Sequence, residues 1–350
     1  MEIEIQSRKI GDGHPVFFIA EAGVNHNGSI ELAFQLVDKA FESGADAVKF
    51  QTFKAEKLNT KHAPKSSYHI ETTGDDKEQS WFELLKTQEL DREDHRRIIK
   101  YCNKKGIIFL STPYDKDSAD LLDELGVPAF KLASTDTSNL PLLRHVARKN
   151  KPMIISSAMC TMEEVTAAVE TIRSEQLEKI VVLQCTGNYP SKLEDSNLNV
   201  MSSYREILNC LVGYSDHTFE LINPVASVAL GASVYEKHFT IDKSLPGPDH
   251  RMSLSPDELK MTIEAVKQTQ VALGSSCKVV LPSEEENRKK LRKSLVTAVD
   301  IVKGTNITAE MICIKRPGNG ISPAKLQEII GKEILIDAPE ETILQNSMFK

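Results

Sequence analysis

Residues 16–23 read Val-Phe-Phe-Ile-Ala-Glu-Ala-Gly, an apolar run that carries one carboxylate, Glu21, near its end. Seven more apolar runs follow, and nearly all of them end in polar residues: 46–51, 107–112, 129–134, 153–159, 180–186, 211–217 and 234–240. Continuous apolar runs are typical of parallel strands that are buried on both faces. Because helix-length segments separate them, the runs predict an α/β fold in which eight parallel strands close into a (β/α)8, or TIM, barrel.

The ends of these runs are where the chemistry is expected, because a TIM barrel builds its active site at the C-terminal ends of its strands. Charged residues have no packing reason to lie in a buried strand. The polar residues at these ends include hydroxyl, lysine, carboxylate and imidazole side chains. The sequence therefore indicates both a fold and the place of a site within it.

The chain length sets the domain organisation. Its 350 residues fit a barrel of roughly 250 residues followed by a small module. We expect the barrel in residues 1–274, a charged and aperiodic linker in 275–290, and a small β-rich domain in 291–350. Residues 1–15 are predicted to form a hairpin with a turn at 11–13, and 54–90 a long polar loop that acts as a lid or a dimer contact.

Composition narrows the function classes. The net charge of −7 and the scattered basic residues argue against a nucleic-acid partner but allow a small anionic substrate. No apolar run approaches the roughly 18 residues of a membrane span, and the charged start is unlike a signal peptide, so we expect a cytoplasmic protein with no membrane partner. The six dispersed cysteines, without a C-x-x-C pair, indicate reduced thiols.

Two histidines, His217 and His238, end the last two apolar runs. Imidazoles on neighbouring strand ends could share one divalent metal, with carboxylate and water oxygens completing its ligands. Asp249, in the loop that follows, could supply such a carboxylate. The alternative is that the two histidines are unrelated.

Lys49 and Lys131 each lie within an apolar run, and a buried ammonium requires an anion. One interpretation is internal pairing with Glu21, Asp136 or Glu236. Another is a phosphate or carboxylate ligand, held by both lysines and by the hydroxyls of Thr112, Ser134, Ser156 and Ser215. A Schiff-base lysine is a third interpretation.

Three other residues have less specific patterns. Glu21 could contact a sugar hydroxyl or act in acid–base chemistry, or simply pair with Lys49. Tyr189 could cover a ligand or pack. Arg316 stands in a Lys-Arg-Pro-Gly turn of the small domain, where a surface arginine is the simpler interpretation.

Seven motifs together resemble the sialic acid synthase family over essentially the whole chain. They read IAEAGVNHNG (19–28), VKFQ (48–51), FKLAS (130–134), GYSDH (213–217), EKHFT (236–240), GPDH (247–250) and KRPGNG (315–320). The resemblance implies a TIM barrel joined to a C-terminal antifreeze-like (SAF) domain and a domain-swapped homodimer. It implies metal-dependent condensation of phosphoenolpyruvate with N-acetylmannosamine to N-acetylneuraminate and phosphate.

The resemblance also implies roles for single residues. His217 and His238 would bind the catalytic Mn²⁺ or Mg²⁺, with Glu236 beside it. The residues expected to hold phosphoenolpyruvate are Lys49, Thr112, Lys131, Ser134, Ser156 and Ser215. The sugar site is expected to comprise Glu21, Gln51, Tyr189, Asp249 and Arg316, of which Arg316 would reach the active site of the partner subunit. The candidate catalytic carboxylates are Glu21, Glu236 and Asp249.

The chain departs from the family at three places near the expected phosphate and metal regions. It has Thr135-Asp136 where Gly-Glu is frequent, Ser157-Ala158 where Thr-Gly is frequent, and Gly187 where a polar residue is frequent. Three other acceptors or functions therefore stay open. They are a diacetamido sugar, as in legionaminate or pseudaminate synthesis, N-acetylmannosamine 6-phosphate, and non-catalytic carbohydrate binding.

Overall fold

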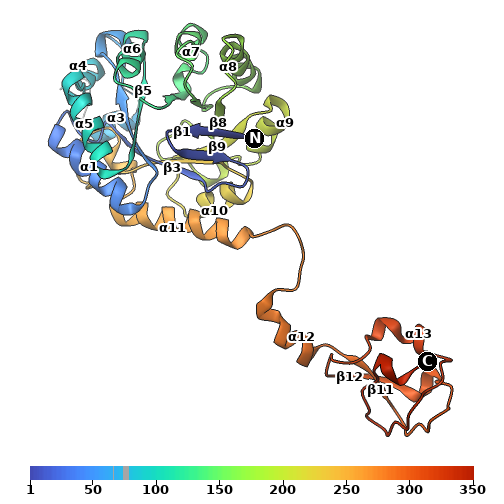
Figure 1. Cartoon of the computed structure of the whole chain (residues 1–350). Coiled ribbons are helices and arrows are strands. Elements are labelled where there is room, and N and C mark those ends of the chain that lie inside the picture. Colours follow the sequence, from blue (N-terminus) through green and yellow to red (C-terminus); the bar gives the residue numbers. More distant parts are fainter. Residues whose placement is uncertain (66, 74–78) are drawn as a thin grey trace. The chain divides into compact units, whose positions relative to one another are not determined.

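The computed structural model describes residues 1–65, 67–73 and 79–350. Eight parallel strands form its main sheet, in the order β5-β4-β3-β10-β9-β8-β7-β6, and β5 and β6 at the two ends of this order lie against each other. The bounds are β3 Phe17–Gly23, β4 Ala47–Thr52, β5 Ile108–Pro113, β6 Phe130–Leu132, β7 Met153–Ser156, β8 Ile180–Cys185, β9 Leu211–Asp216 and β10 Val234–His238. The predicted barrel of eight strands is confirmed (Figure 1).

Helices surround this sheet and follow its strands along the chain (Figure 1). Capping residues set the ends of several of these helices. The N-terminus of α8 has a Thr161–Glu164 capping box, and α1 ends at Gly44, whose φ of 86° is left-handed. The bounds are α1 Ile30–Ser43, α5 Arg92–Lys105, α6 Lys116–Glu124, α7 Leu140–Ala147, α8 Met162–Ser174, α9 Val200–Leu208, α10 Ile222–Ala229 and α11 Pro256–Leu273.

The N-terminal hairpin closes one end of the barrel core. Strands β1 (Glu2–Ile5) and β2 (Arg8–Gly11) pair antiparallel, and their Ile3, Ile5 and Ile10 cluster with the apolar residues of the barrel interior. The hairpin was predicted, and its two strands are joined at residues 6–7. The predicted turn at 11–13 is also present, after β2, where the His14 backbone N–H donates to the Gly11 carbonyl at 3.1 Å. The apolar end of the barrel is thereby covered, and the opposite end is left for the site.

The long segment after β4 is more ordered than the predicted loop. It contains α2 (Ala55–Leu58), α3 (Ser67–Thr73) and α4 (Trp81–Thr87), and it builds a small core of its own from Val24, Phe53, Ala55 and Leu85. These apolar residues are dispersed among polar ones, so no helical period is visible in the sequence. Ser66 and the acidic stretch 74–78 lie outside the described residues.

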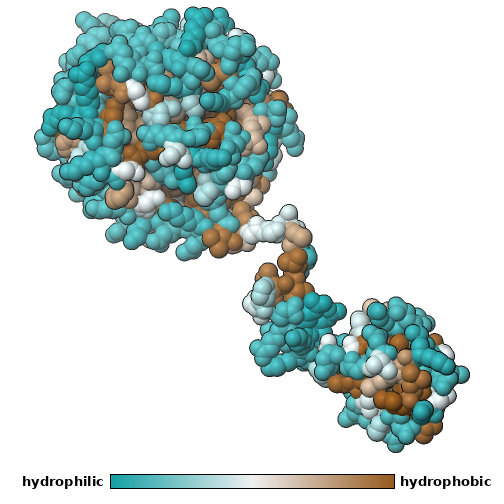
Figure 2. Space-filling view, viewed as in Figure 1, coloured by the Kyte–Doolittle hydropathy of each residue, from teal (hydrophilic) through white to brown (hydrophobic). Residues whose placement is uncertain are grey.

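The chain divides into two compact units, residues 1–274 and 275–350. The second unit contains the antiparallel pair β11 (Ser294–Thr297) and β12 (Ile312–Lys315), over a core that includes Leu295, Ile307 and Phe349. It also contains α13 (Leu326–Ile329), and α12 (Glu285–Leu291), which makes part of the predicted aperiodic linker helical. Figure 2 shows a mostly hydrophilic helical surface on the barrel unit. Within the described ranges, no helix is long and apolar enough to span a membrane.

Candidate active site

The barrel interior has an apolar layer and a polar layer. In β3, β4 and β10, Ile19, Ala47 and Val234 belong to the inner apolar core. Two residues further along each strand, the same inward position is occupied by Glu21, Lys49 and Glu236, all of them buried. The polar layer therefore consists of charged groups held at the C-terminal strand ends by the strand period of two.

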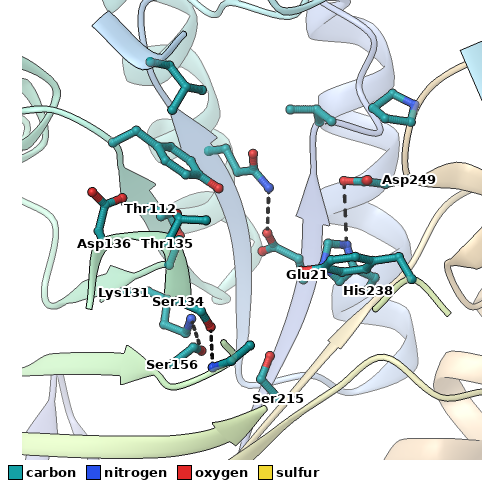
Figure 3. A pocket seen from close by; sticks show the side chains of 18 of the residues that line it. Glu21, Thr112, Lys131, Ser134, Thr135, Asp136, Ser156, Ser215, His238 and Asp249 are labelled. Atoms are coloured by element: carbon teal, nitrogen blue, oxygen red, sulfur yellow. Dashed lines mark hydrogen bonds and ion pairs between the residues drawn. The ribbon is translucent and has the colours of Figure 1, made fainter. Parts of the chain in front are cut away.

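A cavity of about 530 Å³ opens at this layer. Thirteen residues that the sequence singled out line it: Glu21, Lys49, Gln51, Thr112, Lys131, Ser134, Ser156, Tyr189, Ser215, His217, Glu236, His238 and Asp249. Figure 3 shows Glu21, His238 and Asp249 on one side of the cavity and Lys131, Ser134 and Ser156 on the other. Arg316, the remaining predicted site residue, is exposed and belongs to the C-terminal unit, directly after β12.

Lys49 is paired with two carboxylates. Its Nζ lies 2.9 Å from Glu21 Oε2 and 3.7 Å from Glu236 Oε2, and it donates a hydrogen bond to Thr112 Oγ1 at 3.1 Å. Burial disfavours the charged lysine, but Glu21 and Glu236 outweigh it and raise the Lys49 pKa. Internal pairing, one of the interpretations left open by the sequence, is thus present, and it keeps the ammonium charged.

Lys131 is held in a different way. Its Nζ donates to Ser156 Oγ at 2.7 Å and lies 3.5 Å from Glu236 Oε1, which also accepts from Ser215 Oγ at 3.0 Å. Burial lowers the pKa of Lys131, and the Lys49 charge adds to this effect against the attraction of Glu236. Asp136, the third carboxylate considered as a lysine partner, instead accepts from Asn139.

The two glutamates of this cluster have opposite electrostatic character. Burial, with the charge of Glu236 nearby, raises the pKa of Glu21 to about 7. Although burial also opposes ionisation of Glu236, Lys131 and Lys49 together hold its pKa below the usual range. Glu236 is therefore the permanent counter-charge, and Glu21 is a carboxyl that can gain and lose a proton near neutral pH.

His217 and His238 face each other at the cavity, with ring centroids 5.6 Å apart. The Nδ1 of His217 donates to the Thr186 carbonyl at 2.7 Å, so Nε2 carries the lone pair when the ring is neutral. Although burial opposes the charged ring, Cys185 and the Thr186 carbonyl outweigh it and raise the His217 pKa. Burial, together with the neighbouring His217, keeps the pKa of His238 well below its usual range, and its buried Nδ1 has no hydrogen-bond partner among the described residues.

This donor set fits a divalent metal with two protein ligands. A ring nitrogen bonded to a backbone carbonyl is the usual support for a metal-ligating histidine. Across the described part of the chain, no three His, Cys, Asp or Glu side chains gather closely enough to hold a metal ion. The other ligands would accordingly come from water or substrate oxygens, which Mn²⁺ and Mg²⁺ accept readily.

Asp249 and Tyr189 complete this side of the cavity. Asp249 Oδ2 lies 3.9 Å from His238 Nδ1 (Figure 3), and burial raises the Asp249 pKa to about 6. The Tyr189 ring lies over His217 with 4.2 Å between centroids. Gln51 Nε2 donates to Glu21 Oε1 at 3.4 Å, which ties the sugar-site candidates to the lysine cluster.

The three departures from the family pattern lie at or beside the cavity. The cavity is lined by Thr135, Asp136 and Ala158, and by Met159, which contacts Gly187. Ser134 Oγ accepts a hydrogen bond from the Ala158 backbone N–H at 2.9 Å. Ser157, by contrast, donates to the Leu183 carbonyl and does not line the cavity. The substitutions therefore change the wall but leave the Ser134 hydroxyl anchored.

Sequence reasoning missed several lining residues. Cys185, treated as a buried thiol, is buried but also faces the cavity, with Sγ 3.8 Å from His217 Nδ1. Its place at the end of β8 was an available signal. From the segment after β4 come Leu58, Asn59, Trp81, Leu84, Leu85 and Gln88, which have no strand-end pattern that could have found them.

The chain matches two family models: the NeuB family over residues 36–278 and the SAF domain over residues 292–350. It is 41% identical to an N,N'-diacetyllegionaminic acid synthase of Legionella pneumophila over 95% of this chain and 94% of that protein. It is 36% identical to the human N-acetylneuraminate-9-phosphate synthase, over 99% and 97% of the two chains.

Among solved structures, the spore coat polysaccharide biosynthesis protein SpsE of Bacillus subtilis superimposes with a TM-score of 0.69. That comparison covers 100% of this chain and 99% of the other, at 36% identity. The family match spans well over half of the chain, and the relatives match both units end to end. The chain therefore belongs to the NeuB family of nonulosonic acid synthases and carries the SAF domain at its C-terminal end.

Proposed function

We propose that the protein condenses phosphoenolpyruvate with an acetamido sugar and releases phosphate, giving a nine-carbon 2-keto acid. The observation that carries the proposal is the buried cluster in which Lys49 and Lys131 share Glu236 at the floor of the cavity. Two ammoniums held in place by one carboxylate are preorganised for an anion with several negative charges. The names of the relatives, which are synthases of nonulosonic acids, support the same reaction class.

Phosphoenolpyruvate would bind between the two lysines. Its phosphate and carboxylate oxygens would accept from the lysines and from the hydroxyls of Thr112, Ser134, Ser156 and Ser215. The Lys49 and Lys131 charges would offset the anion throughout the reaction, and their burial makes that contribution larger than it would be in water.

The reaction balances as follows. Carbon 3 of phosphoenolpyruvate forms a bond to the aldehyde carbon of the open-chain sugar, whose oxygen takes up a proton. Water adds to the cationic carbon 2 and loses a proton. The resulting hydroxyl oxygen becomes the keto oxygen as the bond between carbon 2 and the phosphate oxygen breaks, and the hydroxyl proton leaves with the phosphate. Glu21 would accept the proton of the water, and the support for this role is its pKa of about 7 together with its hydrogen bond from Gln51. Asp249 would orient a sugar hydroxyl.

We also propose a resident divalent cation, Mn²⁺ or Mg²⁺, on His217 and His238. When bound there, the cation would polarise the aldehyde oxygen of the acceptor. The support is the tautomer of His217, which the Thr186 carbonyl fixes, and the unpartnered Nδ1 of His238 within the described structure.

The acceptor that we propose is a diacetamido trideoxyhexose. N-acetylmannosamine, the acceptor expected from the sequence, is the second candidate. The chain is 41% identical to the N,N'-diacetyllegionaminic acid synthase and 36% identical to the N-acetylneuraminate-9-phosphate synthase. The enzyme would distinguish substrates that differ by one acetamido group through contacts with the cavity wall, because the lysine cluster would bind phosphoenolpyruvate in either case.

The working form is proposed to be a domain-swapped homodimer, in which Arg316 contacts the N-acetyl group of a sugar bound to the partner. The support is the resemblance of the KRPGNG motif (315–320), which contains Arg316, to the family pattern, together with the SAF domain match over residues 292–350.

The proposed function is tested by incubating the protein with phosphoenolpyruvate, Mn²⁺ and a panel of acceptors, followed by mass spectrometry and a phosphate assay. The panel contains the diacetamido trideoxyhexose, N-acetylmannosamine and its 6-phosphate. We expect one phosphate per molecule of nine-carbon acid, and none with His238→Ala. Absence of product from every acceptor, with phosphoenolpyruvate and metal bound, would refute the proposal. Borohydride trapping of a lysine without metal would instead favour a Schiff-base lyase.

A further inference from the structure

One wall of the cavity contains two amide side chains, each with one buried atom that has no hydrogen-bond partner among the described residues. Gln88 is 3% exposed, and its Oε1 has no hydrogen-bond partner among the described residues. The buried Nδ2 of Asn59 likewise has none within that part of the chain, and both residues line the cavity. A buried polar atom without a partner costs about 1–3 kcal/mol, so two in one wall indicate that something else satisfies them.

The rest of this wall is apolar. Leu58, Trp81, Leu84 and Leu85 line the cavity beside the two amides. Leu85 belongs to the small core of the segment, and Leu58 and Trp81 pack against that core. The wall thus offers one hydrogen-bond acceptor, one donor and an apolar surface between α2 and α4.

Hydrogen bonds and ion pairs join α2 and α4, the two helices that Asn59 and Gln88 directly follow. Glu89, next to Gln88, accepts from the Ala55 backbone N–H at 2.8 Å at the start of α2 and from Lys54 Nζ at 2.9 Å. Lys86 of α4 donates to Glu56 of α2 at 2.7 Å. These contacts tie the first turn of α2 to the last turn of α4, and so they fix the backbone beside Gln88.

An acetamido group matches these features. Its N–H can donate to Gln88 Oε1, its carbonyl can accept from Asn59 Nδ2, and its methyl group can pack on the leucines and Trp81. A hydroxyl has no methyl group for the apolar surface. A phosphate would need a cation here. In the described part of this wall, Lys57 is already paired with Asp117 and lies 4.0 Å from Asp115, and burial lowers the pKa of His69.

We infer that this wall, defined by Asn59, Gln88, Leu85 and Trp81, binds a second acetamido group and selects a diacetamido sugar as acceptor. The inference rests on the proposed function. It assigns to the segment after β4 a role in substrate choice that the strand-end residues cannot supply, since those residues contact the parts that all candidate acceptors share.

Gln88→Leu tests the inference, because leucine fills a similar volume and removes the hydrogen bond. Steady-state kinetics would compare kcat/KM for the diacetamido sugar with that for N-acetylmannosamine. We expect the variant to lower the first value about 10-fold, as for loss of one buried hydrogen bond, and to leave the second within about 2-fold. Asn59→Leu should act in the same direction.

Gln184→Leu is the matched control. Gln184 is also a buried glutamine of the barrel, but its Nε2 donates to the Ser196 carbonyl and it does not line the cavity. We expect this variant to keep the wild-type ratio of the two kcat/KM values even if it is less stable. A ratio that Gln88→Leu leaves unchanged, or that Gln184→Leu changes equally, would overturn the inference.

A binding measurement separates this inference from the proposed function. The reduced, unreactive alditols of the two sugars would be titrated into protein with phosphoenolpyruvate and Mn²⁺. Tighter binding of the diacetamido alditol in wild type, lost in Gln88→Leu, is the expected result. Equal or weaker binding would overturn the acetamido wall. Failure of wild type to turn over any acceptor would overturn the reaction, and the alditol titration would still decide the wall.

Discussion

Lys237 Nζ lies 2.9 Å from Asp216 Oδ2 in the layer behind the two histidines at the cavity. The two residues are register partners on β10 and β9, each adjacent in sequence to one of those histidines, and both are almost fully buried. Asp216 also accepts from Tyr235 Oη and from the Thr218 backbone N–H. This pair therefore joins the two strand ends that carry His217 and His238.

Replacing one partner of the Lys237–Asp216 pair should lower the free energy of unfolding more than replacing both partners. Asp216→Leu leaves the Lys237 ammonium buried and unpaired, so we expect the free energy of unfolding to fall by about 3–5 kcal/mol. Asp216→Leu/Lys237→Met should recover most of that loss, measured by urea unfolding in a double-mutant cycle. Lys39→Met, which breaks the exposed pair with Glu42, serves as the control and should change stability by less than about 1 kcal/mol. Additive effects at Asp216 and Lys237 would contradict a coupled pair.

Replacing Lys131 should weaken the binding and use of phosphoenolpyruvate rather than those of the sugar. Lys131→Met removes one of two buried charges that face the proposed anion, and we expect kcat/KM for phosphoenolpyruvate to fall about 10²–10³-fold. The measurement is steady-state kinetics at saturating sugar, with direct titration of phosphoenolpyruvate as a second readout. Lys149→Met, a change on the outer helical layer, is the control. An unchanged affinity for phosphoenolpyruvate in Lys131→Met would contradict the proposed anion site.

Much of the barrel was predictable because its strands are buried on both faces. The runs around Ile19, Val48 and Val234 are continuous, and their polar ends coincide with the cavity because the strand period places Glu21, Lys49 and Glu236 on one inner layer. For such residues, position along a strand fixes position in space.

The wall built by α2 and α4 could not be predicted in the same way. Asn59 and Gln88 are 29 positions apart, in a segment whose small core joins residues from Val24 to Tyr114. Long-range contacts of this kind leave no local period. Cys185 was missed for a simpler reason: cysteine is common in cores, so a buried thiol is its ordinary interpretation even at the end of a strand.

Removing the proposed divalent cation should stop turnover without unfolding the barrel. The apolar core does not include His217 or His238, so the far-UV circular dichroism spectrum should be unchanged by a chelator. Excess Mn²⁺ should raise the melting temperature of the wild type by linkage to the folded state, and not that of His238→Ala. An equal rise in both proteins would place the ion elsewhere.

The buried histidine His250 should make part of the stability pH-dependent. Its Nδ1 contacts Thr240 Oγ1 at 2.6 Å, and burial lowers its pKa to about 4 from an ordinary 6.5. The unfolded chain binds the proton more readily, so this stabilisation is present above pH 6.5 and is lost as pH falls toward 4, by about 3 kcal/mol at most.

His250→Gln isolates this contribution. The raised pKa values of Glu21 and Asp249 act in the opposite direction over part of the same range, so the wild-type curve alone combines several groups. Urea midpoints of wild type and variant would be compared at pH 7.5 and 4.5. We expect the stability difference between them to shrink at the lower pH. A difference that does not vary with pH would contradict the neutral, buried state of His250.

The proposed domain swap predicts that two inactive variants restore each other. Arg316→Ala keeps an intact cavity but lacks the guanidinium, and His238→Ala keeps the guanidinium but lacks a ligand of the proposed metal. In a heterodimer with swapped SAF domains, one cavity receives both intact parts. Co-expression with two different tags should therefore give about a quarter of wild-type activity for random pairing, and about half in purified heterodimers. If Arg316 acts within its own chain, each cavity of the heterodimer carries one defect, and the purified heterodimer stays as inactive as its parents.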